Sequence, residues 1–500
     1  MMDELKKFVT YEDFGAVGDG EHDDMEAIAA AHAYANAHKL PVKTKWDAHY
    51  YIGPKAITAV IETDVDWNTS RFTIDDRAVE DRTVPCFIVK TTLAAQEIKI
   101  DKLTCDTKQL DIHPEHDCHV TVYNDNVRHY IRLGLNVNNG QAAQDTFVLK
   151  KDGSVCSMLD WDHEVITRVE VQSIDDTPLT IKGGVFTTIA NCEESKYNYY
   201  ARGIMVNRSR VTVDGLVHHI AGEISHGAPY RGILIIEKCA YIALNNCFFT
   251  GHKTYWTIGA AGLPVPMGSY DIVINSVVDL HITNCRVNGI TDRTRWGVIG
   301  TNFCKNIVLE DCEFSRLDAH MGVSGEYTIR RCKLGHQGLN AIGHGLMTVE
   351  DSTVYGDSLI CFRTDYGSIW RGDVVVKNCK WVPACGEECS PKLFMITNAG
   401  MHDFGYPCSM PTTFTVENLY VEDSHTPADY AGLELFTDPD APVDGADFVI
   451  SEPRPYPYAP SKAVTVSGLA TYSGKPVRIG AARKLLENSL ITVNGVQLHE

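Results

Sequence analysis

A short pattern recurs along the chain and constrains its fold more than any other feature. An apolar and a polar residue are followed in most copies by Asn, Asp or Gly, then by a small or apolar anchor, any residue and a second apolar one. Because apolar and polar residues alternate, each copy predicts a short strand with one buried face. The clearest copies are Leu244–Phe249, Ile282–Val287, Leu309–Phe314, Ile329–Leu334, Val349–Val354 and Val376–Trp381.

The spacing of the copies distinguishes between repeat architectures. Successive anchors are 38, 27, 20, 20 and 27 residues apart, whereas a helical repeat would keep one period. Constant strands joined by loops of changing length are typical of a parallel β-helix, whose stacked coils share a core that no coil could bury alone. Stacking would place thiol over thiol in that core, where a free Cys behaves as a small apolar side chain. The anchors are Cys247, Cys285, Cys312, Cys332, Ser352 and Cys379.

The N-terminal segment agrees with this architecture. Residues 14–24 read FGAVGDGEHDD and precede Ala27 and Ile28; this run resembles the N-terminal signature of the pectate-lyase-like right-handed β-helix superfamily. That superfamily includes polygalacturonase-like hydrolases, polysaccharide lyases, epimerases and phage tailspikes, so the resemblance implies a right-handed solenoid and leaves the reaction open. Asp23 is placed to cap a helix that Pro41 ends. We expect this helix to cover the open end of the solenoid.

The predicted fold is therefore an all-β, right-handed parallel β-helix with an N-terminal capping helix. We assign the cap to residues 1–60 and the β-helix to residues 61–425, with long excursions from the early coils up to about residue 180. Residues 426–500 form a Pro-rich tail with closing strands. Seven prolines occur between Pro427 and Pro460, and Pro is unsuited to central strands because it has no N–H to donate.

Composition limits the partners. The 65 acidic and 45 basic residues give a net charge of −20, which argues against a nucleic-acid surface. The charge also disfavours polyanionic substrates unless a local basic patch offsets it. No apolar run is long enough to span a membrane. No signal peptide is visible, so we expect a cytoplasmic protein with reduced thiols, or a secreted one if a leader has been removed. The sequence is also compatible with a homo-oligomer.

Acidic, imidazole and guanidinium groups recur at similar distances after the anchors, which predicts that they gather on one flank of the solenoid. Asp318 follows Cys312 by 6 residues, and Asp365 follows Ser352 by 13. These two carboxylates lie two coils apart, roughly 9–10 Å along the axis at about 4.8 Å per coil. That separation is near the upper end of the roughly 6.5–9.5 Å of an inverting glycosidase.

This flank predicts a carbohydrate-active enzyme that acts on an oligo- or polysaccharide, most simply a glycoside hydrolase. Asp318 and Asp365 are the acid and base candidates, and His344 is a third catalytic candidate. The Gly343-His344-Gly345 triplet resembles the context of a His in polygalacturonase-like hydrolases, although the Asn-Thr-Asp, Asp-Asp and Arg-Ile-Lys motifs of that family are absent here. The predicted sugar-binding residues are Asp292, Arg293, His320, Glu326, Arg363, Tyr366 and Arg371.

Two other functions fit the same residues. In a polysaccharide lyase or uronate epimerase, Arg363 or Arg371 would neutralise the sugar carboxylate, and His344 or Tyr366 would remove the C5 proton. A non-catalytic, tailspike- or adhesin-like solenoid would bind a glycan without cleaving it. Recurrent carboxylates and the lack of a Lys-rich clamp favour hydrolysis. We predict neither a cofactor nor a metal site.

Overall fold

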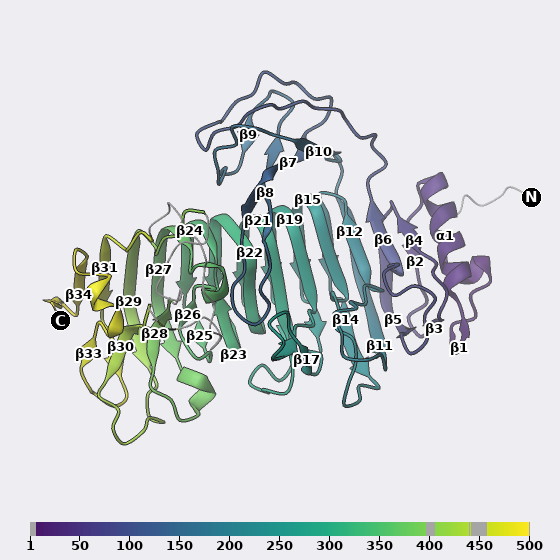
Figure 1. Cartoon of the computed structure of the whole chain (residues 1–500). Coiled ribbons are helices and arrows are strands. Elements are labelled where there is room, and N and C mark those ends of the chain that lie inside the picture. The colour runs from purple at the N-terminus through teal and green to yellow at the C-terminus, as the bar shows by residue number, and fades with distance from the viewer. Residues whose placement is uncertain (1–6, 397–405, 440, 442–457, 500) are drawn as a thin grey trace, which may run out of the picture.

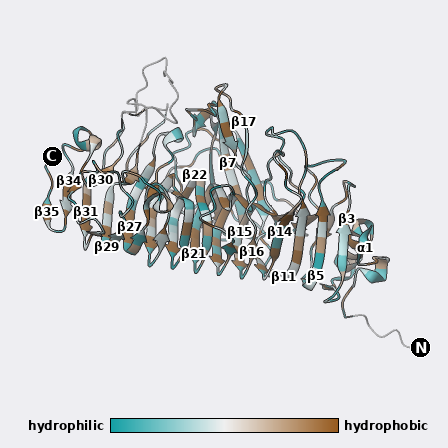
Figure 2. Ribbon diagram, turned by 90° about the horizontal axis from the view of Figure 1, so that it is seen from below, coloured by the Kyte–Doolittle hydropathy of each residue, from teal (hydrophilic) through white to brown (hydrophobic). Residues whose placement is uncertain are grey.

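The computed structural model describes residues 7–396, 406–439, 441 and 458–499. Parallel strands stack along one axis into a solenoid (Figure 1). Within the described residues they form, together with one antiparallel strand at the C-terminal end, a continuous 29-stranded sheet. Figure 2 shows apolar positions recurring along these stacked strands. The predicted parallel β-helix is confirmed.

The first twelve strands of this sheet are interrupted by the N-terminal helix after β1 and by one large insertion after β6. They are β1 (Asp19–Asp23), β2 (Val42–Lys43), β3 (His49–Ile52), β4 (Ala59–Ile61), β5 (Val65–Asp75), β6 (Phe87–Lys90), β11 (Leu179–Ile189), β12 (Ile204–Asn207), β13 (Val211–Asp214), β14 (Val217–Ala221), β15 (Leu234–Asn245) and β16 (Phe248–Phe249).

The remaining strands of the sheet form the central and C-terminal coils. They are β19 (Ile272–Thr283), β20 (Arg286–Val287), β21 (Val298–Glu310), β22 (Glu313–Arg330), β23 (Lys333–Asn340), β24 (Gly343–Glu350), β25 (Thr353–Val354), β26 (Ile360–Cys361), β27 (Trp370–Trp381), β28 (Lys392–Met395), β29 (Thr413–Val421), β30 (Leu433–Phe436), β31 (Ala463–Ser467), β32 (Ala470–Thr471), β33 (Val477–Arg478), β34 (Leu490–Val493) and β35 (Val496–Gln497).

The recurring anchors mark one corner of the solenoid. The N–H of Glu313 donates to the carbonyl of Cys285, and the N–H of Lys333 donates to that of Cys312, so successive anchors lie over one another. The residue before each anchor turns the chain with a positive φ, as at Asn284 (φ 52°), and Asn tolerates this conformation better than most side chains. The six anchors are all buried. The predicted thiol ladder is therefore confirmed.

Helix α1 (Met25–His38) covers the N-terminal end of the stack, as predicted. The carboxylate of Asp23 accepts the N–H of Met25, whereas the residue at the N-cap position is Asp24, which accepts the N–H groups of Val17 and Gly18. The helix start thus lies one residue later than the predicted cap. A left-handed Lys39 (φ 54°) ends the helix before the proline.

The long excursions expected in the early coils are one insertion between β6 and β11. It folds into a separate antiparallel sheet of β7 (Cys118–His129), β8 (Gln141–Leu149), β9 (Val155–Cys156) and β10 (Arg168–Ser173). This insertion stands on the upper edge of the solenoid in Figure 1. Val148 and Ile174 pack against Ala240 of β15 and Val278 of β19. The segment between β16 and β19 forms a hairpin of β17 (Tyr255–Ile258) and β18 (Pro264–Met267), which projects from the coils.

Stacking extends beyond both boundaries that the sequence suggested for the β-helix. At the N-terminal end, β3 already pairs with β5. At the C-terminal end, β31 pairs with β29 and β34 pairs with β31. Much of the Pro-rich stretch lies outside the described residues. Within the described chain, no helix is long and apolar enough to cross a membrane.

Asp271, before β19, makes the stability of the coils depend on pH. Its carboxylate is buried and accepts the N–H of Val298 at 3.0 Å. Burial raises the pKa of Asp271 to about 7, against roughly 3.9 in the unfolded chain. The folded chain therefore holds a proton on Asp271 that the unfolded chain releases. The contribution of this group to the free energy of unfolding is fully present below about pH 4 and is lost as pH rises through about 7.

We expect Asp271→Asn, which keeps an acceptor for Val298 and cannot ionise, to unfold in urea with a midpoint that changes less between pH 5 and pH 8. At pH 8 the variant should be the more stable of the two proteins. An equal loss of stability in parent and variant between pH 5 and pH 8 would show that Asp271 does not cause the pH dependence.

Candidate active site

One groove on the solenoid gathers charged and aromatic side chains from distant parts of the sequence. It encloses about 440 Å³ between the coils, the tip of the insertion and the β17–β18 hairpin. We call it the Arg–Asp groove. Its charged, imidazole and aromatic lining residues are Arg132, Arg316, Asp318, His320, Arg363, Asp365, Tyr197, Tyr199, Tyr270 and Trp296.

Arg363 joins the two predicted catalytic carboxylates. Its Nη1 donates to Asp318 at 2.7 Å, while Nε and Nη2 donate to the two oxygens of Asp365 at 3.0 and 2.8 Å. The register places Asp318 beside Asn340, and Asn340 beside Cys361 in the next coil. The two acids therefore come from positions two coils apart, as the anchors predicted, and their side chains meet on one guanidinium.

Two further guanidinium groups complete the ion-pair network. Arg132 of the insertion lies 2.7 Å from Asp365, and Arg316 lies 3.3 Å from Asp318. Insertion and coils also meet through their backbones, since the N–H of Leu133 donates to the carbonyl of Asp365 at 2.8 Å. The insertion is thus part of the groove.

The network sets the protonation of both carboxylates. Burial alone would raise the pKa of Asp318, but the charges of Arg316 and Arg363 outweigh it and hold that pKa well below its usual range. Burial likewise raises the pKa of Asp365, and Arg363 and Arg132 lower it to a net value below normal. Both groups are therefore ionised at neutral pH in the free protein.

A chain of hydrogen bonds along the stack fixes the tautomer of His320. The Glu237 carboxylate accepts from Asn275 Nδ2 (2.8 Å), and Asn275 Oδ1 accepts from Asn302 Nδ2 (2.6 Å). Asn302 Oδ1 then faces His320 Nδ1 at 3.0 Å, and Tyr366 Oη lies 2.9 Å from Nε2. Since a carboxylate only accepts, the proton of His320 sits on Nδ1 and Nε2 accepts from Tyr366. Burial, followed by the charge of Arg363, lowers the pKa of His320 to about 3, so the ring is neutral.

The groove thus brings together five of the predicted site residues. Asp318, His320, Arg363 and Asp365 line it, and Tyr366 lies buried behind His320.

His344 and Arg371 lie apart from the groove, contrary to the expectation of a single flank. His344 pairs in register with Ser324 rather than with the segment around Asp318, because β22 turns a corner of the solenoid between these two positions. His344 is buried, and Arg371 lies against its ring with nitrogens 2.9 and 3.1 Å from the imidazole nitrogens.

Three other predicted residues also lie outside the groove lining and make local contacts instead. The Glu326 carboxylate accepts from Thr328 at 2.8 Å. The Asp292 carboxylate accepts the N–H of Thr294 at 2.9 Å, as turn Asp residues commonly do. Arg293 donates to the carbonyl of Ala384 and pairs with Glu387.

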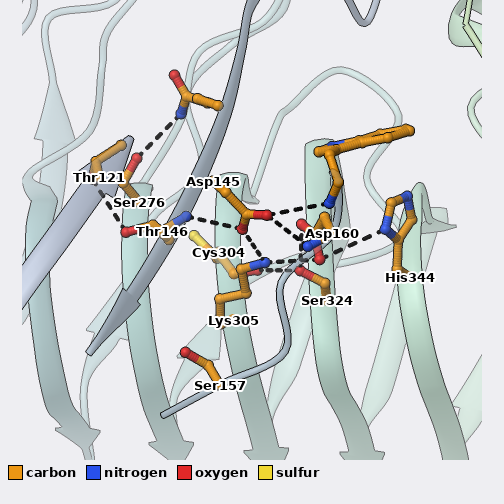
Figure 3. A network of polar contacts seen from close by, with 12 residues as sticks. Thr121, Asp145, Thr146, Ser157, Asp160, Ser276, Cys304, Lys305, Ser324 and His344 are labelled. Atoms are coloured by element: carbon orange, nitrogen blue, oxygen red, sulfur yellow. Dashed lines mark hydrogen bonds and ion pairs between the residues drawn. The ribbon is translucent and has the colours of Figure 1, made fainter. Parts of the chain in front are cut away.

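A buried ionic cluster joins the insertion to the coils (Figure 3). Lys305 of β21 lies 2.6 Å from Asp145 and 2.7 Å from Asp160. Ser324 donates to Asp160 at 2.9 Å, and His344 lies 3.6 Å from the same carboxylate. Both acids come from the insertion, and the other three groups come from the solenoid. Lys305 and His344 are almost completely buried and lie outside the groove lining, so this cluster joins the insertion to the coils.

Several groove residues were not predicted. Arg316 stands two positions before Asp318 in β22, so strand alternation could have revealed it. Tyr197 and Tyr199 lie in the loop between β11 and β12, so no strand period points to them. Arg132 belongs to the insertion, which carries no copy of the repeat, and nothing in its local sequence signals this position. Within the described residues, no group of three or more His, Cys, Asp or Glu side chains could hold a metal ion.

Comparisons with known proteins give limited matches. No family model matches the chain. A capsule depolymerase specific for KL64, from Klebsiella phage P510, is 29% identical over 121 residues, which cover 22% of this chain and only 12% of that protein.

Solved structures share the architecture at low identity. The Pseudomonas phage phi297 tailspike is 13% identical over 95% of this chain and 84% of its own, with a TM-score of 0.49. The tailspike of Acinetobacter phage AP22, solved with a capsular saccharide, is 9% identical over 97% and 79%, also at 0.49. An exopolygalacturonase from Thermotoga maritima is 10% identical over 89% and 93%, at 0.37.

Proposed function

We propose that this chain is a carbohydrate-active enzyme that binds an acidic polysaccharide in the Arg–Asp groove and cleaves a glycosidic bond there. The observation that carries the proposal is the pair of carboxylates, Asp318 and Asp365, held by one guanidinium in an open groove with aromatic walls. Aromatic faces with a few fixed polar groups are typical of small-molecule and sugar sites. The short match to a capsule depolymerase supports the same class of substrate.

The charge of the groove favours an acidic polymer. Arg132, Arg316 and Arg363 outnumber Asp318 and Asp365, so the groove is locally positive in a chain of net charge −20. Guanidinium groups bind carboxylates through paired hydrogen bonds. A sugar carboxylate would therefore find its partners here.

Hydrolysis assigns the two acids complementary roles. One ionised carboxylate activates water, and the other must deliver a proton to the leaving oxygen. An anionic sugar that pairs with Arg316 or Arg363 would weaken the hold of these groups on Asp318. The pKa of Asp318 would rise in the complex, and this carboxyl would then serve as the acid.

Elimination at a uronate is the second candidate, and the protonation of the free groove favours it. A lyase needs cations to neutralise the sugar carboxylate and a neutral base, and the three Arg residues and His320 meet these needs. The base would be His320 rather than His344, which lies outside the groove, and substrate binding would first have to displace the Tyr366 hydroxyl from Nε2 so that this nitrogen can accept the C5 proton. For either reaction, a polysaccharide substrate such as a capsule lies outside the cell. The comparisons lend no support to a cytoplasmic location.

The test is a panel of purified KL64 capsule, polygalacturonate, alginate, hyaluronan and neutral dextran. Reducing ends report any cleavage, and ultraviolet absorbance reports the unsaturated sugar of elimination. We expect reducing ends from at least one acidic polymer, without absorbance if the reaction is hydrolysis and with it if the reaction is elimination. Cleavage of dextran alone, or binding of an acidic polymer without cleavage, would contradict the proposal.

A further inference from the structure

The β17–β18 hairpin exposes an unusual apolar surface. Trp256 and Ile258 are 60% and 61% exposed, and together with Pro264 they form one wall of a depression of about 640 Å³. We call this the Trp256 depression. Its other wall is polar and carries Glu194, Ser195, Lys196 and His226. An apolar wall facing polar groups is the composition of a binding site.

The hairpin is held in place. Its opposite face is buried through Tyr255, Val265 and Met267, so strand alternation directs Trp256 outward. The N–H of Ala261 at the tip donates to the carbonyl of Leu135 in the insertion at 3.0 Å. The indole is therefore presented on a fixed support.

The Trp256 depression adjoins the Arg–Asp groove. Val265 and Pro266 of the hairpin line the groove, while Trp256 and Pro264 line the depression. The same holds for the segment at 194–199, since Tyr197 lines the groove and Lys196 lines the depression. One polymer could therefore occupy both sites.

The chemistry of the hairpin favours a sugar over a protein strand. An extended peptide would add to the free edge of β18, but Pro264 and Pro266 have no N–H to donate there. An indole face instead packs against the C–H face of a sugar ring, and the neighbouring Glu194, Ser195 and Lys196 offer groups for its hydroxyls.

We propose that the Trp256 depression is a second subsite, in which Trp256 stacks on a sugar ring of the polysaccharide held in the Arg–Asp groove. This inference rests on the proposed function and adds to it a preference for long chains. A short oligosaccharide fills only the groove, whereas the intact polymer reaches both sites.

The experiment compares Trp256→Ala with Trp46→Ala, in which a tryptophan that is 69% exposed is removed from the N-terminal region. Both changes are made in the full chain and in an Asp365→Asn background, so that binding is measured without cleavage. The ligands are the polymer cleaved in the panel and its purified trisaccharide, titrated by calorimetry. Thermal unfolding verifies that each variant folds.

We expect Trp256→Ala to weaken binding of the polymer by about fivefold to tenfold and to leave the affinity for the trisaccharide unchanged. The control variant Trp46→Ala should bind both ligands like the parent. Equal losses for both ligands, or no loss for either, would overturn the subsite. A change in sedimentation with unchanged binding would assign the surface to a protein contact and would overturn it too. Failure of the proposed function is distinct, because no polymer of the panel would then be cleaved by the parent chain.

Discussion

Asp318→Asn and Asp365→Asn should each lower kcat by about three orders of magnitude or more, because each removes a charge that the proposed reaction uses at the scissile bond. The amide has nearly the shape of the carboxylate, but its –NH2 replaces one oxygen that faces a guanidinium group. Release of reducing ends from the polymer identified in the panel measures the effect, and thermal unfolding shows whether the fold persists.

Asp373→Asn is the matched control for these variants. Asp373 is an exposed acid of β27 that accepts from Thr413 at 2.7 Å, outside the groove lining. Its replacement should leave the rate unchanged. If both groove variants kept more than about a tenth of the parent rate, neither carboxylate would be catalytic.

Lys305→Met should cause a large loss of stability. The variant leaves the buried Asp145 and Asp160 without their cation, and breaking a buried ion pair by removing one partner costs about 3–5 kcal/mol. Lys305 is 1% exposed, so water cannot replace it. Urea denaturation followed by circular dichroism measures the change.

Lys333→Met provides the comparison, since Lys333 pairs with Glu313 at 3.0 Å with more than half of its side chain exposed. Exposed pairs of this kind contribute about 0–1 kcal/mol. Replacing both acids as well, in Lys305→Met/Asp145→Asn/Asp160→Asn, should recover most of the lost stability. A loss below about 1 kcal/mol in Lys305→Met would show that the cluster does not anchor the insertion.

This anchoring has a consequence for the groove. Arg132 and Leu133 of the insertion contact Asp365 directly, so a loosened insertion would change one wall of the site. The buried cluster is thus a positioning device for the groove.

The solenoid was predictable because its signal is local and repeated. Each strand, its left-handed corner and its anchor lie within six residues, and the register of Asp318 and Asp365 follows from counting coils between Cys312 and Ser352. The same counting failed for His344, because an offset from an anchor does not reveal where a long strand such as β22 turns a corner.

The electrostatics of the site were not predictable for a different reason. Whether Asp365 carries a proton depends on Arg132, which belongs to the insertion without the repeat, and the protonation of both acids depends on how closely Arg363 approaches each of them. Such contacts follow from tertiary packing, and the spacing of residues along one chain does not encode them.

The most direct test of the account is a crystal structure of the Asp365→Asn chain with an oligosaccharide of the cleaved polymer. We expect a sugar ring in the Arg–Asp groove, its carboxylate within about 3 Å of Arg132, Arg316 or Arg363, and the glycosidic oxygen beside Asp318. An oligosaccharide bound on another face of the solenoid, with Asp318 and Arg363 untouched, would contradict it.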